Sequence, residues 1–166
     1  QHQRLADRCG THHFGAAGCY ADMAAGQGLT GIVSTTSRVI TVVPTYGADR
    51  VLGTNPFAFS ARPASQPTVT LDMSTSISAA NKVKASAFKG KDIPAGWVID
   101  GEGRAVTDSP TAYRQLFETQ AGGLTAIGGA GMELGGHKGY GLAIFAQILS
   151  GALGGGSFSP VRNRTQ

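Results

Sequence analysis

The sequence is poor in charged residues, aromatic residues and cysteine, and each shortage excludes a class of protein. Only 14% of its 166 residues are charged, whereas hydrophobic residues make up 41%. An average domain has about 25% charged residues, so this composition excludes both a disordered chain and a coiled coil. The two cysteines, Cys9 and Cys19, form neither a CxxC motif nor a disulfide framework, and a reducing cytoplasm is therefore the expected compartment.

Long apolar runs and basic stripes are missing as well. The longest mainly apolar stretch, residues 139–153, is interrupted by Gln147 and Ser150 and is shorter than the ~20 residues that span a bilayer. We therefore expect a soluble protein without a membrane partner. The net charge of +4 comes from scattered basic residues with few aromatics near them, so no nucleic-acid partner is expected. A small molecule that carries phosphate is a simpler explanation of the positive charge than a nucleic acid.

Glycine, in contrast, is abundant. The 25 glycines are about twice the average share. The length corresponds to a single domain, residues 1–166, which buries roughly two-thirds of the surface of its unfolded chain. The chain opens Gln-His-Gln-Arg, without a basic-then-apolar leader, so no secretory signal is expected and the sequence resembles a piece of a longer protein.

Hydrophobic periodicity and turn residues predict an alternation of helices and strands. We expect helices over residues 15–27, 78–88 and 139–153, with Ser76 or Ser78 as N-cap of the second. Strands are expected over residues 29–34, 39–43, 57–61, 68–73 and 97–99, the last within a turn-rich segment from 91 to 126. The third helix is expected to face the core with Leu142, Phe145, Ile148, Leu149 and Ala152.

Two histidines, His12 and His13, precede the first predicted helix. A histidine at such a place can shuttle a proton, because its unperturbed pKa lies near neutral pH. Adjacent side chains point in different directions, so at most one of the two is catalytic. The alternative is that both are ordinary polar loop residues. No carboxylate lies near these histidines or His137 at ligand spacing, and a metal-dependent hydrolase is therefore not favoured.

Two junctions between predicted elements could hold an anion. The strand end at residues 71–76 carries hydroxyls before a helix, where phosphate or ribose oxygens can bind, although such residues often only cap the helix. The second junction, residues 135–141, places Lys138 among glycines. His137 occupies the Walker lysine position and no Ser or Thr follows it, so an NTPase is excluded, and no GxGxxG follows a strand. Asn55 could bind a substrate carboxylate or simply form a turn.

The order of six short motifs along the chain resembles the malate/L-lactate dehydrogenase family. These motifs are His-His-Phe-Gly-Ala-Ala-Gly (12–18), Ser-Thr-Thr-Ser (34–37), Leu-Gly-Thr-Asn-Pro (52–56), Leu-Asp-Met-Ser-Thr-Ser (71–76), Ile-Pro-Ala-Gly-Trp (93–97) and Gly-Gly-His-Lys-Gly-Tyr-Gly-Leu (135–142). The resemblance covers about residues 10 to 158. It implies an NAD(P)-dependent oxidoreductase with an α/β, non-Rossmann fold, in which helices flank a mixed, largely antiparallel sheet.

The resemblance also implies roles for individual residues. His13 matches a histidine that moves the substrate proton, and Ser37 matches a serine that contacts the nucleotide. The segment that matches the dinucleotide-holding loop consists of Thr70, Leu71, Asp72, Met73, Ser74, Thr75 and Ser76. His137 and Lys138 match a second cofactor contact. No metal is implied.

The family resemblance further implies a cytoplasmic homodimer that acts on a small carboxylate substrate. Hydride would pass between nicotinamide and a 2-hydroxy or 2-oxo acid, or a related imino acid. NAD and NADP both stay open, since Arg38 could meet a 2′-phosphate but has ordinary alternatives. We expect the chain to be the central cofactor-binding portion of a longer enzyme; the alternative is a non-catalytic module that needs further N- and C-terminal segments.

Overall fold

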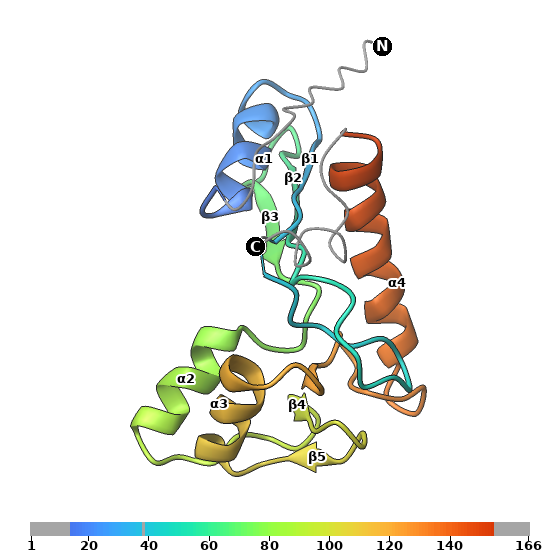
Figure 1. Cartoon of the computed structure of the whole chain (residues 1–166). Helices are drawn as coiled ribbons and strands as arrows, with labels where there is room; N and C mark the ends of the chain where they lie inside the picture. The colour runs from blue at the N-terminus through green and yellow to red at the C-terminus, as the bar shows by residue number, and fades with distance from the viewer. Residues whose placement is uncertain (1–13, 38, 155–166) are drawn as a thin grey trace.

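The computed structural model describes residues 14–37 and 39–154. It has two parts, each built around an antiparallel three-stranded sheet, and one long helix extends from the second part along the first (Figure 1). The first sheet has the order β1-β2-β3 and the second the order β5-β4-β6. The strands are β1 (Gly31–Ser34), β2 (Phe57–Ala61), β3 (Val69–Met73), β4 (Val98–Ile99), β5 (Ala105–Val106) and β6 (Gly123–Leu124). The helices are α1 (Ala17–Gly26), α2 (Ala80–Phe88), α3 (Ser109–Glu118) and α4 (Gly136–Gln147), which continues into a π-helical segment, η1 (Ile148–Ala152).

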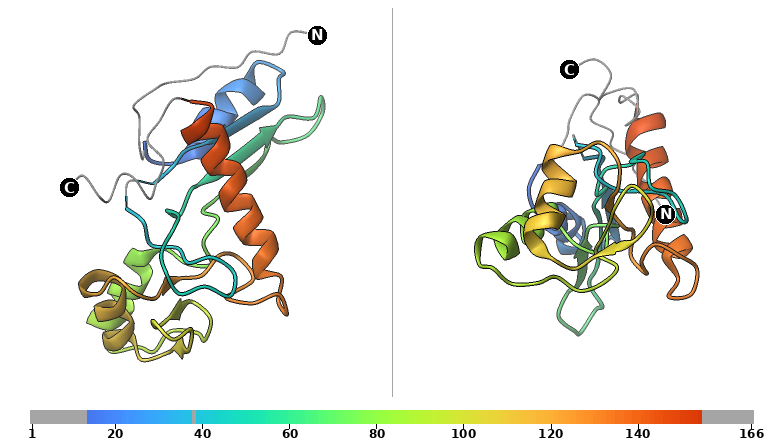
Figure 2. Two further views of the ribbon diagram at one scale, coloured as in Figure 1. Left: turned by 45° about the vertical axis from the view of Figure 1, so that its right-hand side comes forward. Right: turned by 60° about the horizontal axis from the view of Figure 1, so that its bottom comes forward.

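Helices α1 and α4 lie on opposite sides of the first sheet (Figure 2). Ala17 and Ala21 are four residues apart, so they share one face of α1, and both pack against Ala58 of β2. Gly31 of β1 allows this close approach, because a Cβ there would collide with the backbone of Ala21. The expected α/β arrangement with a largely antiparallel sheet is confirmed.

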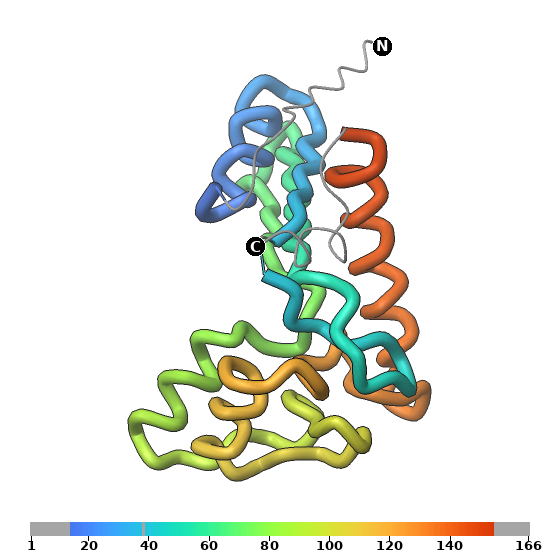
Figure 3. The backbone as a smooth tube through the Cα atoms, in the orientation of Figure 1, coloured from blue at the N-terminus to red at the C-terminus, as the bar shows by residue number. Residues whose placement is uncertain are grey.

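The main hydrophobic core lies around the second sheet. Val42, Leu52, Val98 and Leu124 are almost completely buried there, and Val83 of α2 packs into the same cluster. Residues 39–56 connect β1 to β2 and run past the start of α4 before they return to the first sheet (Figure 3). This connection therefore links both parts to α4.

Several predicted elements are confirmed and one is wrong. Helices α1 and α2 and strands β1, β2, β3 and β4 lie within the segments predicted for them. Residues 39–43 form no strand, since Val42 makes only isolated bridges to Leu52 and Leu124. Residues 40–43 are all buried, without the alternation of a one-sided strand. The β-branched side chains of residues 40–43 therefore pack in the core, and their backbone forms no strand.

The segment from 91 to 126 contains more regular structure than predicted. Helix α3 begins after Asp108, whose carboxylate accepts a 2.9 Å hydrogen bond from the backbone N–H of Thr111, and Pro110 occupies its first turn. The short strands β5 and β6 also escaped prediction. Neither Ser76 nor Ser78 caps α2, because the N-cap is Ala79, which provides no side-chain cap.

The face by which α4 packs also differs from the prediction. Its buried residues are Gly136, Gly139, Ala143, Ala146 and Gln147. Leu142, Phe145 and Ile148 of the predicted core face are 42–47% exposed. Small residues bring the helix backbone close to its neighbours, and this contact turns the large side chains outward. None of the helices among the described residues is long and apolar enough to cross a membrane.

Candidate functional site

The end of β3 leads into the predicted dinucleotide loop. Thr75 is fully buried, and its hydroxyl donates 3.1 Å hydrogen bonds to the carbonyl oxygens of Thr54 and Asn55. The Ser76 hydroxyl donates to the carbonyl of Ser78 at 2.8 Å, and the Ser74 hydroxyl donates to the carbonyl of Ser76 at 3.1 Å. These side chains therefore shape the loop itself, and its backbone is the surface that a ligand could meet.

The strand residues before this loop point to both faces of the sheet. Thr70 and Asp72 face α1, where the Thr70 hydroxyl donates to Asp22 and the Asp72 carboxylate accepts from Gly18. Leu71 and Met73 alternate to the other face of β3. The seven consecutive residues predicted to hold the dinucleotide consequently cannot all contact one ligand through their side chains.

Ser37 lies beside the loop after β3. Its hydroxyl is 2.7 Å from the hydroxyl of Thr54, and its backbone N–H donates to Asn55 Oδ1 at 3.2 Å. The Thr54 carbonyl in turn accepts from the backbone N–H of Thr75 at 3.0 Å. The structure thus brings Ser37 and the loop together through Thr54.

Asn55 is a structural residue. It is fully buried at a positive φ of 31°, and its amide group donates to the carbonyl of Ala143 and to the side chain of Gln147. The amide therefore ties the β1–β2 connection to α4. The hypothesis that Asn55 binds a substrate carboxylate is wrong, because these internal hydrogen bonds occupy its amide group.

The start of α4 forms one wall of a cavity of about 470 Å³. His137 and Lys138 line this cavity together with Glu133, and Met132, Leu134 and Leu142 supply its apolar part. Gly135, the N-cap of α4, has a φ of 87°, a conformation that glycine adopts without strain. The backbone N–H groups of Gly136 and Lys138 donate to the carbonyl oxygens of Gly131 and Gly135 at 3.0 and 2.9 Å. The helix dipole and the positive charge of the Lys138 side chain are therefore what favour an anion here.

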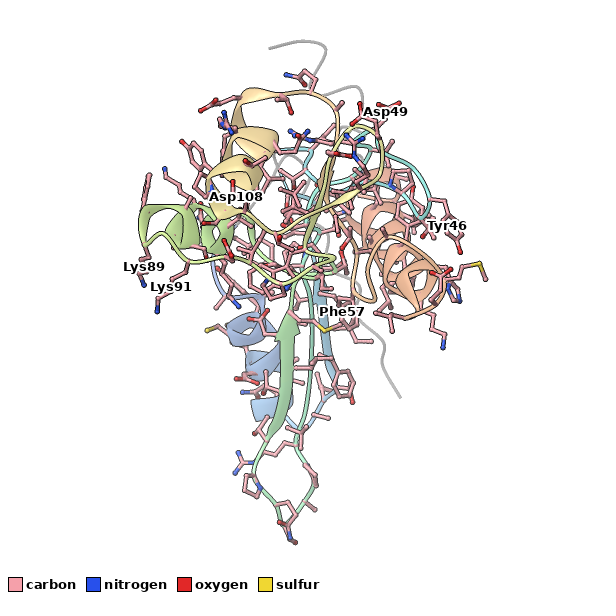
Figure 4. The ribbon with its side chains drawn as sticks, turned by 90° about the horizontal axis from the view of Figure 1, so that it is seen from below. Tyr46, Asp49, Phe57, Lys89, Lys91 and Asp108 are labelled. Carbon is pink, nitrogen blue, oxygen red and sulfur yellow. The ribbon has the colours of Figure 1, made fainter. Side chains whose placement is uncertain are left out.

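Tyr46 holds the loop that closes this cavity. Its hydroxyl donates to Glu133 Oε1 and accepts from the backbone N–H of Met132, both at 3.2 Å. Its own backbone N–H donates to the carbonyl of Ala130 at 2.9 Å. Figure 4 shows Tyr46 on the side of the molecule that carries α4, with Lys89 and Lys91 on the opposite side. Sequence reasoning missed both Tyr46 and Glu133, although Glu133 is the one acidic residue after Glu118.

The two predicted anion sites are connected through Ile127. The backbone N–H of Ile127 donates to the carbonyl of Thr75 at 3.0 Å. Gly139 of α4 packs against the same residue, since a Cβ there would lie 2.6 Å from the Ile127 nitrogen. Ile127 also lines the cavity, whereas residues 70–76 do not. The loop after β3 and the start of α4 are therefore neighbours, and the cavity belongs to the second of them.

The remaining predicted site residue, His13, lies outside the described residues. The residue after it, Phe14, packs edge-on against Tyr20 of α1, with ring centroids 4.9 Å apart.

No group of three or more histidine, cysteine or acidic side chains within the described ranges is arranged to hold a metal ion. Tyr140 of α4 packs against the main core, and burial raises the pKa of its phenol.

Comparison with known proteins finds relatives both by sequence and by structure. Malate dehydrogenase of Pyrococcus horikoshii is 45% identical over 157 residues, which are 94% of this chain and 41% of that protein. Among solved structures, malate dehydrogenase of Entamoeba histolytica superposes with a TM-score of 0.82 at 29% identity, over 92% of this chain and 42% of that one. Delta1-piperideine-2-carboxylate reductase of Pseudomonas syringae superposes with a TM-score of 0.75 at 33% identity, over 90% and 41%.

The chain thus spans about two-fifths of the length of the relatives that it matches. The family model described as malate/L-lactate dehydrogenase matches residues 7–166. The match runs through all six motifs, and the family expected from them is confirmed: the chain belongs to the malate/L-lactate dehydrogenase family.

Proposed function

We propose that the chain is the cofactor-binding portion of an NAD(P)-dependent oxidoreductase. The reaction is hydride transfer between nicotinamide and a small 2-hydroxy or 2-oxo acid, or a related imino acid. Relatives named malate dehydrogenase and piperideine-carboxylate reductase support both substrate types. The observation that carries the proposal is the chain of contacts from Ser37 through Thr54, Thr75 and Ile127 to the start of α4.

The residues at the start of α4 fit an anionic nucleotide. The positive end of the α4 dipole favours a phosphate at this helix start, and the Lys138 ammonium group neutralises part of its charge. The apolar side chains of Met132 and Leu134 suit the flat faces of a base. Ser37 and the loop at Ser74–Ser76 do not line the cavity, but they adjoin this helix start through Thr54 and Ile127. The bound cofactor supplies the hydride, and these residues orient it and exclude water.

His13 is proposed to move the proton at the substrate oxygen or nitrogen. Support comes from the family motif, in which the histidine stands four positions before Ala17, the first residue of α1. Replacing it in the complete enzyme, His13→Ala, is expected to lower kcat by roughly 10²-fold or more, because general acid–base catalysis contributes about that much. NADH affinity, measured by fluorescence, should stay unchanged. A wild-type kcat in the variant would assign the proton to another group.

The family resemblance also supports a cytoplasmic homodimer as the working form. Both properties are parts of the proposal, as are the substrates of the whole protein. NAD and NADP are equally compatible with the residues of the site.

Titration with NADH and NADPH tests the proposed function. We expect nicotinamide fluorescence to rise on binding and the Tm of the chain to increase. Lys138→Ala is expected to weaken binding by about 10- to 100-fold, since a charge-assisted hydrogen bond contributes about 1.5–3 kcal/mol. Lys91→Ala is the matched control, because Lys91 is exposed on the opposite side of the molecule (Figure 4). Folded chain that binds neither nucleotide would contradict the proposal.

A further inference from the structure

The carboxylate of Asp72 joins two of the family motifs. Asp72 Oδ2 accepts a 2.8 Å hydrogen bond from the backbone N–H of Gly18, which lies 54 positions earlier. Gly18 is the second residue of α1, where backbone N–H groups have no partner within the helix. The N-cap residue Ala16 provides no side-chain cap, and the first turn contains no acidic residue. A side chain from strand β3 therefore caps α1.

The fit around this hydrogen bond is tight. Gly18 is buried, and a Cβ there would lie 3.1 Å from Asp72 Cβ and 3.2 Å from Thr70 Cγ2. One turn further along α1, Asp22 Oδ1 accepts from the hydroxyls of Ser60 at 2.6 Å and Thr70 at 2.5 Å. Two carboxylates thus fix the same face of α1 to strands β2 and β3.

We propose that Asp72 is a positioning residue whose carboxylate serves α1 and does not contact the cofactor. Its backbone belongs to the strand that leads into Ser74–Ser76, and its side chain holds the start of α1, where the histidine motif ends. A negative charge at this end of the helix also interacts favourably with the helix dipole. Asp72 would thereby fix the position of the start of α1 relative to the loop after β3.

The functional consequence rests on the proposed function. Hydride and proton transfer require the reacting groups to be aligned closely, and a displacement of about 1 Å can cost roughly 10²-fold in rate. Phe14 of the histidine motif is also held against α1, because it packs against Tyr20 and the cluster that contains Ala17. Loss of the cap is expected to disturb alignment more than cofactor affinity.

The test compares Asp72→Ala, Asp72→Asn and Asp92→Ala in ¹⁵N-labelled chain. Asparagine keeps an oxygen that can accept the Gly18 hydrogen bond, whereas alanine does not. Asp92 is an exposed carboxylate on the loop after α2 and is the matched control. In Asp72→Ala we expect amide exchange at Gly18 to accelerate roughly tenfold or more, with Asp72→Asn much closer to wild type and Asp92→Ala unchanged.

A second measurement separates positioning from direct cofactor contact. NADH affinity of Asp72→Asn should stay within about threefold of wild type. In the complete enzyme, kcat of Asp72→Ala should fall further than its KM for NADH rises. Unchanged Gly18 exchange in Asp72→Ala would overturn the cap. A large loss of NADH affinity in Asp72→Asn, with Gly18 still protected, would overturn the positioning role. Failure of wild-type chain to bind NADH would contradict the proposed function alone, because the Gly18 comparison needs no cofactor.

Discussion

At the scale of single residues, glycines decide how closely the elements that carry the site approach one another. Gly139 has space only for a hydrogen, because a Cβ there would meet the backbone of Ile127. Gly141, two residues later in the same helix, has open space where a Cβ would lie, with no neighbouring atom within 4 Å. The two glycines share a helical backbone but have different surroundings, and they form a natural pair of test sites.

Gly139→Ala is expected to destabilise the chain by about 1–3 kcal/mol, since overpacking forces the backbone to shift. The shift would move α4 away from Ile127 and weaken NADH binding as well. Urea unfolding and NADH titration measure the two effects. Gly141→Ala should instead stabilise the chain by roughly 0.5–1 kcal/mol, because alanine is the better helix former. Equal effects of the two substitutions would contradict the packing described for α4.

Polar residues mark the limit of prediction at this scale. The sequence indicates that Asn55, Thr75 and Ser76 lie at turns and strand ends, and the structure agrees. A hydroxyl or amide at such a place can bond to a ligand or to the chain itself with the same chemistry. Only the fold shows that Thr75 and Asn55 use theirs internally.

At the scale of helices and strands, local signals predict an element well where they are periodic and bounded by glycine or proline. Helix α1 ends before the glycine at position 28, which has a positive φ of 74°, and strands β2 and β3 flank a loop that contains Pro63 and Pro67. Helix α3 escapes prediction because Asp108, Ser109 and Pro110 are typical of a turn, although the same residues can begin a helix. The buried face of α4 also escapes prediction, because the helix buries its small residues and leaves its larger apolar side chains exposed.

Arg50 connects the C-terminal end of α3 to the core. Its guanidinium donates to the carbonyl oxygens of Gly122, Leu116 and Gln115 at 2.6, 3.1 and 2.5 Å. Two of these carbonyls, those of Gln115 and Leu116, lie at the end of the helix, and the Gln115 carbonyl also accepts from the Thr119 hydroxyl at 2.8 Å. Partial burial lowers the pKa of Arg50 from its ordinary high value.

Arg50→Met is expected to lower the free energy of unfolding by about 2–4 kcal/mol, because it removes the guanidinium donors of these three carbonyl oxygens. The Gln115 carbonyl keeps the Thr119 hydroxyl as a donor. Lysine at this position should recover only part of the loss, since one ammonium group cannot reproduce the planar set of donors. Thermal unfolding followed by circular dichroism measures both. Arg104→Ala is the control, because Arg104 makes only exposed ion pairs with Asp100 and Glu102. A Tm unchanged by Arg50→Met would refute the role of this contact.

At the scale of the whole molecule, the first sheet presents two different faces. One is covered by α1, and the other carries apolar side chains that are partly open to solvent, among them Ile32 at 60% and Leu71 at 44% exposure. Their register is shared, since Ile32, Phe59 and Leu71 are consecutive cross-strand neighbours. The sequence predicted these strands but not which face each residue would occupy, because that depends on where α1 and α4 pack.

The arrangement of the site follows from this global packing. No local pattern indicates that Ile127 would lie between the loop after β3 and the start of α4, or that residues 39–56 would reach Ala130 through Tyr46. The order of the motifs predicted the family, and the contacts between them arise from the tertiary fold. That residues 1–166 form a single domain stays a prediction.

Chemical-shift mapping of ¹⁵N-labelled chain during titration with NADH is the decisive experiment for a shared cofactor site. We predict that backbone amides of Ser74–Ser76 and of Gly135–Lys138 shift together, with one common Kd, since the proposed function has both junctions hold the same dinucleotide. Amides around Lys89 and Lys91, on the opposite side, should not move. Saturable shifts at only one junction, or none at either in folded chain, would contradict the claim that the two junctions form one cofactor site.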